Sequence, residues 1–414
     1  MRILYLHQFF VTRAGTGGTR SYEFARRLVE AGHEVTMVTA AGAAEGPGAR
    51  SRGLAREHDV DGIRVLEVRA GYSDYVTATG MGYGRRGLAF AGFALAATAV
   101  ALRGPRPDVV FATSPPLTIA LPAIAAARRH RTPLAFEVRD LWPDAPIQMG
   151  ALRHPLARRG ARALERLAYR AADELVALSP GMRAAIVARG VAPERVALIP
   201  NAADLDLFAP DADAGDLRAE LGLGDAFVCA YFGTMGEAND LTQVVEAAAL
   251  LRERGEDGVS FVLQGAGKRR AQLERSVRER GLESVVLLPA GDKHAAARLA
   301  AASDACMTIF KDVPILATNS PNKLFDTFAA GRPAIVNTDG WMRELVERNE
   351  AGVYARAGDP ADLADKVVLL RDDPELVRRY GENARALAER EFDRRLLADR
   401  LRGVLERCSS PTAS

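Results

Sequence analysis

The chain contains 414 residues, 48% of them apolar, which is more than one typical hydrophobic core accommodates and predicts two domains. Its 55 basic and 53 acidic residues almost cancel, so no overall charge points to nucleic acid as a partner. The three cysteines lie far apart and no histidines have metal-binding spacing, which favours a reducing, cytoplasmic compartment and gives no support to a zinc site.

Short apolar runs in the first half of the chain predict strands, with helical segments between most of them. The runs cover residues 3–9, 34–39, 63–68, 108–113, 134–138 and 174–179. This alternation is typical of a parallel sheet with helices on both faces. The predicted first domain, residues 1–203, is therefore a doubly wound, Rossmann-like α/β domain.

The same pattern starts again after Pro200 and predicts a second Rossmann-like domain over residues 204–387. Its strands are expected at residues 227–233, 259–265, 285–289, 306–310, 334–337 and 352–355. Residues 197–204 are the expected crossing between the domains. The helical, charged segment from about residue 388 to 414 is expected to pack back on the first domain. Ligands of such sheets bind beyond the carboxyl ends of the strands, which directs the search for a site.

A glycine cluster follows the first predicted strand. Gly17 and Gly18 precede a helix expected over residues 21–31, where glycines let the backbone approach a donor ligand closely. The cluster matches neither the G-x-G-x-x-G of dinucleotide folds nor the G-K-[ST] of a P-loop. A plain turn is an equally good interpretation of the cluster by itself.

Polar residues crowd the end of the strand at residues 134–138. We expect Asp140 to accept a proton from a nucleophilic hydroxyl or to orient a sugar, and Arg139 to pair with Asp140 or with a charge on the acceptor. Glu137 and Trp142 are the expected acceptor-binding residues. The structural alternative is an internal Arg–Asp pair that closes the loop.

Two strands of the second domain are also followed by glycines: Gly233 after the first, and Gly265 and Gly267 after the second, with Lys268 next to them. A lysine beside a glycine-rich loop suits a phosphate. The glycines are equally well explained as turn residues. Together with the segment described next, they indicate a diphosphate-sized anion.

Residues 318–333 predict a short helix with well-marked ends. Ser320 is expected to cap it, Pro321 to occupy its first position and Gly331 to end it. Lys323 falls in the first turn, where a cation gains nothing from the helix dipole unless an anion binds there. The alternative is a surface helix with a solvated lysine. Lys323 is the expected catalytic cation, and the expected donor-binding residues are Thr318, Asn319, Ser320, Asn322 and Asp326, with Asp326 on the ribose.

The order of several motifs resembles the retaining glycosyltransferases of family 4, which have the two-domain GT-B fold. These motifs are G-G-T-R-S-Y-E-F-A-R-R-L, A-L-I-P-N-A-A-D-L-D-L-F, Y-F-G-T-M-G, Q-G-A-G-K and S-P-N-K-L-F-D-T-F-A-A-G-R-P, and they span nearly the whole chain. More narrowly, F-E-V-R-D-L-W-P and S-P-N-K-L-F-D with a later G-W look like the branch of fucosamine-type and N-acetylaminosugar transferases of bacterial surface polysaccharide synthesis.

The resemblance implies a nucleotide-sugar donor bound mainly by the second domain, retention of the anomeric configuration and no essential metal. It favours a UDP-linked N-acetylated or deoxyamino hexose and a sugar or lipid-linked sugar as acceptor. Two departures stand out. The family has two glutamates with seven residues between them, and here the second place holds Asp326 and the first holds Thr318. The family's Gly-Arg after the first strand of this domain is replaced by Glu237 and Ala238, which leaves the phosphate charge to Lys323, with Lys268 second.

Three other functions are weighed against this one. The D-x-D motifs at residues 59–61, 204–206 and 211–213 would suit a manganese-dependent transferase, but none follows a strand of a parallel sheet where a metal-bridged diphosphate would lie. A sugar-nucleotide epimerase shares the two-domain architecture. A sugar-nucleotide-binding module without catalysis is conceivable because Thr318 replaces a carboxylate. The oligomeric state stays open.

Residues 87–102 carry no charge over sixteen positions, which is short of the roughly twenty that span a bilayer. A helix buried against the first sheet is expected. The alternative is that its edge and the flanking Arg85, Arg86, Arg103 and Arg106 meet an anionic membrane, as a peripheral protein on the inner face would.

Overall fold

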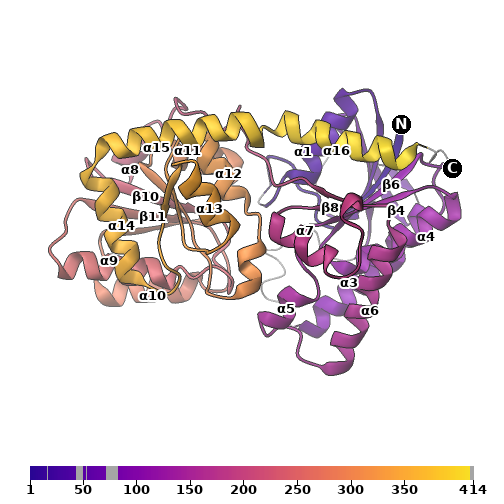
Figure 1. The fold of residues 1–414 in the computed structure, drawn as a ribbon, viewed down its shortest axis with the longest axis horizontal. Helices are drawn as coiled ribbons and strands as arrows, with labels where there is room; N and C mark the ends of the chain where they lie inside the picture. The colour runs from indigo at the N-terminus through magenta and orange to yellow at the C-terminus, as the bar shows by residue number, and fades with distance from the viewer. Residues whose placement is uncertain (16, 43–49, 53, 71–82, 411–414) are drawn as a thin grey trace. The chain divides into compact units, whose positions relative to one another are not determined.

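The computed structural model describes residues 1–15, 17–42, 50–52, 54–70 and 83–410. It consists of two compact units (Figure 1). Unit 1 contains Met1–Pro200 and the residues from Arg395 onward, and unit 2 contains Asn201–Arg394. The divisions differ from the expected 203/204 and about 388, because Ala203 pairs with Asp393 in a bridge inside unit 2. Residues 201–203 and 388–394, which were expected to belong to the first domain, therefore lie in unit 2.

Unit 1 is built on one nine-stranded sheet with the order β3-β4-β5-β2-β1-β6-β7-β8-β9. The strands from β5 to β9 in this order are parallel, whereas β3, β4 and β5 pair antiparallel. All six predicted strands are confirmed. The strands are β1 (Arg2–Leu6), β2 (Glu34–Ala40), β3 (Arg50–Arg52), β4 (Ala55–Val60), β5 (Ile63–Val68), β6 (Val109–Ser114), β7 (Leu134–Val138), β8 (Glu174–Ala177) and β9 (Val196–Leu198).

The antiparallel edge was not predicted because β4 has no apolar run. Its sequence A-R-E-H-D-V exposes Arg56 and Asp59 and buries Ala55 and His58, so it offers too few apolar residues to stand out. Strand β9 is only three residues long and lies where the expected crossing segment begins.

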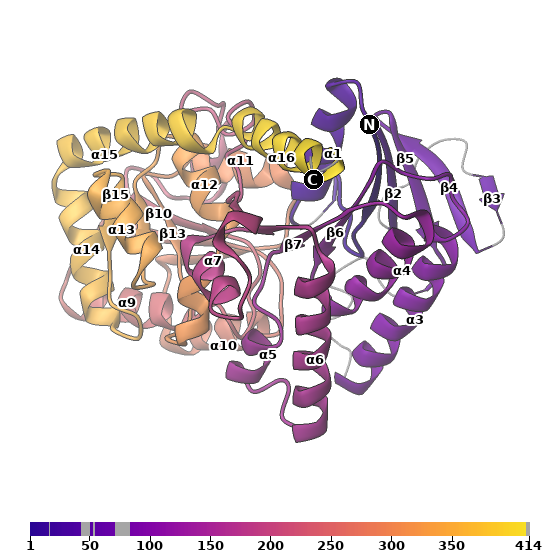
Figure 2. The ribbon, with the colours of Figure 1, turned by 45° about the vertical axis from the view of Figure 1, so that its right-hand side comes forward.

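Helices cover both faces of this sheet. Crossovers between parallel strands are right-handed, so the direction in which the chain crosses the sheet decides the face on which the connecting helix lies. Helices α3, α4 and α6 connect strands in the direction from β5 to β8 and lie on one face. Helix α1 connects strands in the opposite direction and lies on the other face. Figure 2 shows α3, α4 and α6 side by side. Helix α16 lies beside α1 and buries Leu397, Leu401 and Leu405 (Figure 1). The helices are α1 (Arg20–Glu30), α3 (Tyr83–Ala101), α4 (Ala120–His130), α5 (Asp144–Gln148), α6 (Pro155–Ala171), α7 (Pro180–Val187) and α16 (Arg394–Ser409), with short 3-10 turns η1 (Leu117–Ile119) and η2 (Pro193–Arg195).

Helix α3 contains the uncharged segment. It packs through Phe93, Ala94 and Ala97, which are almost fully buried, as the expected helix against the first sheet requires. It also leaves Leu88 and Leu95 about three-quarters exposed, at 75% and 74%. In the part of the chain that the structure describes, no helix has both the length and the hydropathy to cross a membrane.

Unit 2 contains a six-stranded parallel sheet with the order β12-β11-β10-β13-β14-β15. All six predicted strands are confirmed, as β10 (Phe227–Phe232), β11 (Val259–Gln264), β12 (Val285–Leu288), β13 (Ala305–Thr308), β14 (Ala334–Val336) and β15 (Gly352–Tyr354). The helices are α8 (Leu217–Glu220), α9 (Thr242–Glu253), α10 (Arg270–Arg280), α11 (Lys293–Ala301), α12 (Asn322–Ala329), α13 (Trp341–Arg348), α14 (Pro360–Asp372) and α15 (Pro374–Leu387), with a 3-10 turn η3 (Pro314–Thr318) and a π-helical turn η4 (Ala388–Phe392).

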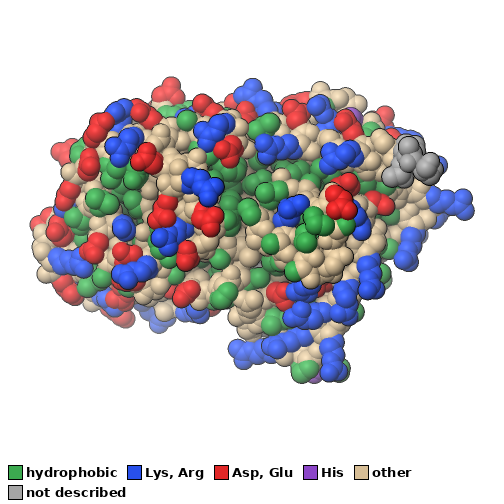
Figure 3. All heavy atoms as spheres, viewed as in Figure 1, with side chains coloured by type: hydrophobic (Ala, Val, Ile, Leu, Met, Phe, Trp, Pro, Cys, Tyr) green, Lys and Arg blue, Asp and Glu red, His purple; other side chains and the backbone are tan. Residues whose placement is uncertain are grey.

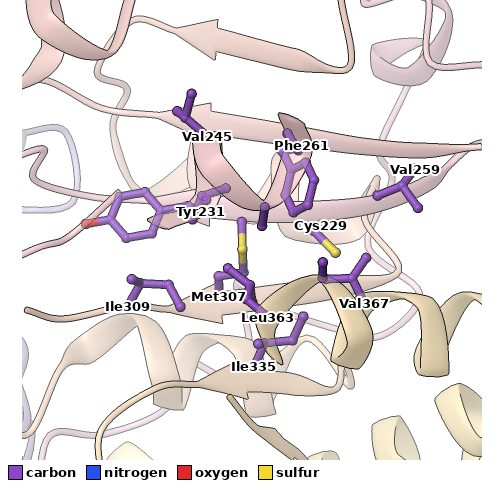
Figure 4. Close-up of a cluster of buried hydrophobic side chains, with 14 of the residues drawn as sticks. Cys229, Tyr231, Val245, Val259, Phe261, Met307, Ile309, Ile335, Leu363 and Val367 are labelled. Carbon is purple, nitrogen blue, oxygen red and sulfur yellow. The ribbon is translucent and has the colours of Figure 1, made fainter. Parts of the chain in front are cut away.

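The core of unit 2 forms between this sheet and helices α9 and α14. Figure 4 shows Phe261, Met307, Leu363 and Val367 converging from strands and helix. Tyr231 lies at the edge of the cluster with its ring in the core and its hydroxyl pointing away from it (Figure 4). Burial of such a ring fixes the position of its hydroxyl, so the end of β10 presents one rigidly placed polar group.

Candidate active site

Each sheet reverses its chain order at one point, and the predicted polar residues lie on strands or loops at or next to that point. In unit 1 the chain proceeds from β1 to β2 on one side and returns to β6 on the other side of β1. In unit 2 it proceeds from β10 to β11 and returns to β13 on the other side of β10. The crevice at the carboxyl ends of such strand pairs is where open α/β sheets bind ligands. The two candidate regions are described in turn.

A buried polar network underlies the carboxyl edge in unit 1. Arg20 donates to one oxygen of Glu137 from Nε at 2.9 Å and from Nη2 at 2.8 Å, and Thr113 donates to the other oxygen at 3.0 Å. Arg20 also donates to the carbonyl oxygens of Ile199 and Pro200, at the end of unit 1. Such a pair is satisfied by hydrogen bonds on both partners, as buried charges require.

This network corrects the expected role of Glu137 as an acceptor-binding residue. Its side chain is completely buried, with no exposed surface, and it is already engaged by Arg20 and Thr113. Glu137 holds Arg20, and Arg20 in turn fixes the end of the strand segment that leaves unit 1. The residue was misassigned because its place in the strand, with the side chain turned inward, does not show in the motif.

Arg139 and Asp140 follow directly after β7 and are both half-buried. Burial raises the pKa of Asp140 to about 6, although the nearby Arg139 charge acts in the opposite direction. Within the described residues no ion pair joins these two side chains, so the alternative of a loop-closing Arg–Asp pair gains no support. A carboxyl group with this pKa at the end of a parallel strand is suited to accept a proton near neutral pH.

Trp142 and the glycines complete the predicted residues of this unit. Trp142 is half-buried and meets Phe90 of α3 edge to face, with 6.4 Å between ring centroids. Gly17 is exposed with φ 141° and Gly18 is half-buried, both just before α1. Their positions in front of a helix N-terminus agree with the prediction, and their role in donor binding stays a prediction.

His7 also belongs to this edge and was not predicted. It follows β1 directly and is 1% exposed, and its Nδ1 lies 2.8 Å from the Ser21 hydroxyl oxygen. Burial and the Arg139 charge hold the pKa of His7 well below its ordinary value, so the ring is neutral. The same rule of strand ends that selected the glycine cluster could have selected His7.

In unit 2, the loops after β10 and β11 are joined backbone to backbone. Gly233 N donates to Gln264 O at 2.9 Å and Met235 N donates to Ala266 O at 2.8 Å. A Cβ on Gly265 would lie 1.9 Å from the Gly233 carbonyl oxygen, a contact no side chain tolerates. The same holds for Gly267 against Met235, at 2.4 Å. The contact between the loops therefore explains these two glycines, and their role in donor binding stays a prediction.

Lys323 lies beside the end of β10. Its Nζ donates to the Tyr231 hydroxyl at 2.6 Å and sits 3.8 Å from the centre of that ring. The Tyr231 hydroxyl in turn donates to the Thr234 carbonyl at 2.7 Å. Burial lowers the pKa of Lys323 to about 7. The ammonium therefore has a neutral partner, and its charge is not neutralised by any described carboxylate within ion-pair distance.

Gly233 gives Lys323 its space. The residue has φ 140°, and a Cβ there would lie 3.2 Å from both Cε and Nζ of Lys323. A side chain at this position would push the lysine away from Tyr231. Gly233, unlike Gly265 and Gly267, is thus tied to the predicted catalytic cation as well as to the loop contact. Lys268 is exposed on the adjoining loop.

The helix that carries Lys323 is anchored at its start. Helix α12 begins at Asn322, which is half-buried, and no side chain of the described chain caps its first turn, so the predicted cap by Ser320 is wrong. The Ser320 hydroxyl instead accepts from the backbone N of Asn201 at 3.1 Å, and the Asn201 amide donates back to the Ser320 carbonyl. Trp341 donates to the Asn319 carbonyl at 3.0 Å.

Asp326 lies one turn further along α12 in a buried cluster of four charges. Both of its oxygens accept from Lys293, at 2.8 and 2.7 Å, and Lys293 also lies 3.2 Å from Asp204. Asp204 accepts from Arg394 at 2.7 Å. Asp326 is 3% exposed. The structure therefore shows Asp326 in an internal ion-pair cluster, not at an open surface, and its contact with a ribose stays a prediction.

Thr318, Glu237 and the D-x-D residues also have observed places. Thr318 ends η3 and donates to the Ile315 carbonyl at 2.7 Å. Glu237 pairs with Arg269 at 2.6 Å on the exposed side of the loop after β10. Asp61 accepts from the Tyr22 hydroxyl at 2.6 Å, and Asp204 belongs to the buried cluster. Across the described ranges, no group of three or more His, Cys, Asp or Glu is arranged to hold a metal ion.

Two family models match successive parts of the chain. Residues 15–202 match the glycosyl transferase 4-like domain, and residues 226–373 match the domain of glycosyl transferases group 1. The protein is therefore a glycosyltransferase. The family 4-like domain comes first along the chain and the group 1 domain second.

Relatives that are named as glycosyltransferases support the same class. The chain is 28% identical over 296 residues to an alpha-D-kanosaminyltransferase from Streptomyces kanamyceticus, covering 70% of each chain. It is 27% identical over 314 residues to WcaI of Escherichia coli, which is named as a colanic acid biosynthesis glycosyl transferase, covering 70% of this chain and 71% of that protein.

Solved structures show the fold. HepE of Anabaena in complex with UDP-glucose superposes with a TM-score of 0.72 at 19% identity, over 98% of this chain and 100% of HepE. Sucrose-phosphate synthase of Thermosynechococcus elongatus gives a TM-score of 0.75 at 20% identity, over 98% of both chains. The chain thus has the GT-B fold expected from the sequence.

Proposed function

We propose that the protein transfers a sugar from a nucleoside-diphosphate donor to an acceptor hydroxyl and retains the anomeric configuration of the sugar. The observation that carries this proposal is the Lys323 ammonium, held over Tyr231 at the end of β10 inside a group 1 glycosyltransferase domain. A cation without a carboxylate partner, beside glycine-lined backbone, is suited to an anionic ligand.

In this reaction the bond between the anomeric carbon and the diphosphate oxygen breaks, and the acceptor hydroxyl attacks from the same side. Negative charge grows on the leaving diphosphate as the bond breaks. Lys323 neutralises this charge, and its position is set beforehand by Tyr231 and Gly233, so little reorganisation is needed at the moment of reaction. The attacking hydroxyl must lose its proton, and a carboxyl with a pKa of about 6, such as that of Asp140, is suited to accept it.

The donor we favour is a UDP-linked N-acetylated or deoxyamino hexose. HepE was crystallised with UDP-glucose, and a relative is named for transfer of kanosaminyl, an aminosugar group. The acceptor is a sugar or a lipid-linked sugar in polysaccharide synthesis, or a small molecule in glycoside synthesis, since the two relatives above divide between these settings. In its narrower form, the proposal is that the protein belongs to the fucosamine-type branch.

We further propose that the reaction needs no metal and takes place in the cytoplasm. Lys323 supplies the charge that a metal would otherwise supply to the diphosphate. The three cysteines are free, and Cys229 and Cys306 are buried, which suits a reducing compartment. Activity that disappears with excess EDTA and returns with manganese would contradict the first part of this proposal.

A panel of nucleotide sugars tests the function. A donor that binds raises the melting temperature by mass action, and the best donor is then incubated with candidate acceptors. We expect a glycosylated product whose anomeric proton, followed by NMR from the start of the reaction, has the donor's configuration. A free epimerised sugar would indicate an epimerase. Tight donor binding without transfer or hydrolysis would indicate a binding module.

A further inference from the structure

One side of unit 1 is rich in arginine and nearly free of acid. Helices α3, α4 and α6 lie together on one face of the sheet (Figure 2). With their flanks, residues 83–106, 120–131 and 153–171, they contain 13 arginines and one acidic residue, Glu165. Glu165 is 2% exposed and accepts from Arg189 at 2.6 Å. No carboxylate of these segments therefore reaches the outer side.

The charge of the whole chain hides this asymmetry. Unit 1, residues 1–200 and 395–414, has 31 arginines, no lysine and 19 acidic residues, a formal net charge of +12. Unit 2 has 24 basic and 34 acidic residues, a formal net charge of −10. Figure 3 shows Lys and Arg side chains gathered over α4 and α6. The near-neutral total thus conceals a strongly basic unit.

The same helices also expose leucine. Among the described residues, eight large hydrophobic side chains are exposed, and five of them lie on α3, α4 and α6. All five are leucines, whereas no aromatic side chain is among the eight. We name the outer side of these helices the arginine–leucine face, with the exposed members Arg85, Leu88, Leu95, Arg103, Leu121, Arg128, Arg129, Leu156, Arg159, Arg166, Leu167 and Arg170.

Helix α6 shows how the face is arranged. Its exposed Leu156, Arg159, Arg166 and Arg170 are spaced by three, seven and four residues and so lie along one side of the helix, while Glu165, Ala168 and Tyr169 are buried on the other. Arg159, Arg166 and Arg170 pair with no described carboxylate within ion-pair distance. In the described part of unit 1, these three arginines therefore form no ion pair, although Arg166 interacts electrostatically with Glu165.

We propose that the arginine–leucine face docks on an anionic lipid bilayer. Arginines bind lipid phosphates, and exposed leucines between them enter the acyl boundary, which is the pattern of interfacial helices. A single-stranded nucleic acid would use the arginines equally well, but its bases stack on aromatic side chains, and the face exposes leucines in their place. The structure thus adds α4 and α6 to the segment that the sequence had indicated on α3.

Vesicle sedimentation with the full chain tests the docking. We expect binding to vesicles of phosphatidylcholine with about 30% phosphatidylglycerol, weakening as salt rises, and none to phosphatidylcholine alone. The triple variant R159Q/R166Q/R170Q should bind on the order of a hundredfold more weakly, since each arginine near the surface contributes about fivefold. The matched control R275Q/R278Q/R348Q removes the same charge from exposed sites of unit 2 and should bind like the wild type.

A second variant tests the leucines. L156S/L167S keeps every arginine, so it should bind at low salt and be released at lower salt than the wild type. Equal binding by the α6 triple variant and its control would overturn the proposal. The proposal would also be overturned if the wild type never binds vesicles and the α6 triple variant instead loses binding to a polyuridine probe, or loses a dimer that the wild type forms.

This experiment is separate from the proposed transferase activity. Vesicle binding needs neither donor nor turnover, and the substituted residues lie outside the candidate active site. Thermal stabilisation by the nucleotide-sugar donor should be the same in wild type, variant and control, which shows that the variants are folded. Failure of transfer with intact vesicle binding would count against the function alone.

Discussion

Lys293 and Asp326 form the central contact of the buried cluster in unit 2, with Nζ 2.7 and 2.8 Å from the two carboxylate oxygens. Asp326 is on the same helix as Lys323, one turn away. Asp204 and Arg394, which complete the cluster, lie close to the two points where the chain passes between the units. The helix that carries Lys323 is thus fastened to both crossing segments.

Removal of the lysine from this cluster should destabilise the protein. In Lys293→Met, Asp326 and Asp204 stay buried with one cation in place of two, and loss of one partner of a buried ion pair costs on the order of 3–5 kcal/mol. Denaturant unfolding measures the change in the free energy of unfolding. Arg275→Met, at an exposed site of α10, is the control and should remain within about 0.5 kcal/mol of wild type. A wild-type stability for Lys293→Met would mean that the cluster is not a structural anchor.

Asp326→Asn separates the cluster from the predicted ribose contact. If Asp326 mainly serves the cluster, the free energy of unfolding should fall by on the order of a few kcal/mol, because Lys293 loses its doubly bonded partner. Donor affinity, measured on protein that is still folded, should then change little. Unchanged stability together with weakened nucleoside-diphosphate binding would instead establish the ribose role.

Lys323→Met should reduce turnover without reducing stability. Loss of one preorganised charge at a leaving group costs on the order of a hundredfold in kcat. Burial places the pKa of Lys323 at about 7 in the folded protein, below its ordinary value. Between these two pKa values the unfolded chain binds one proton more than the folded chain, so the stability of the wild type rises with pH. The melting temperature of the variant minus that of the wild type should therefore be largest at about pH 6 and smallest at about pH 9. A near-normal kcat for Lys323→Met would remove this residue from the mechanism.

Donor binding should take up protons around neutral pH for the same reason. A bound diphosphate favours the charged lysine and raises its pKa, so wild-type affinity should fall as pH rises above about 7. Calorimetric titration in buffers of different ionisation enthalpy counts the protons. In Lys323→Met this uptake should disappear, and uptake that persists unchanged would assign it to another group.

Gly233→Ala should impair catalysis through the lysine. The added Cβ would lie 3.2 Å from Nζ and Cε of Lys323 and would adopt the unfavourable φ of 140°. We expect kcat to fall by on the order of tenfold or more as Lys323 shifts from Tyr231. The control is Gly258→Ala, with φ 78° and open space around its Cβ, which tests backbone strain alone. Equal kinetic losses in both variants would attribute the effect to strain.

Asp140→Asn tests the proton acceptor. With a pKa of about 6, the wild-type carboxyl gains its active, ionised form as pH rises through that value, so kcat/KM should rise through the same interval. The variant should lose this rise together with most of its activity. Because the folded-state pKa is raised, the wild type loses stability as pH increases from about 4 to about 6, and the variant should not. A variant that keeps the rising limb would point to another base.

The strands could be predicted from the sequence because buried parallel strands are uninterrupted apolar runs. All six runs in each half became strands, whereas the charged edge strand β4 and the short β3 escaped notice. The positions of Arg139, Asp140 and Gly233 directly after strands could be predicted in the same way, and Lys323 does lie in the first turn of a helix, whereas the roles of all four stay predictions.

The direction and partners of a side chain could not be predicted, because they depend on residues distant in sequence. Glu137 turns inward to Arg20, 117 positions away, and Asp326 meets Lys293, 33 positions away. Ser320 looks like a helix cap in its local context, but it binds Asn201 instead. Local motifs therefore identified which residues gather near the sites and misjudged which of them are open to a ligand.

Helix α16 completes unit 1 although it is separated from the rest of it by the whole of unit 2. Its buried Leu397, Leu401 and Leu405 cannot pack beside α1 until residues 395–410 have left the ribosome. Unit 2 is continuous in sequence and is free to fold as soon as it is synthesised. During translation, the half of the protein that is made first is therefore the half that finishes folding last.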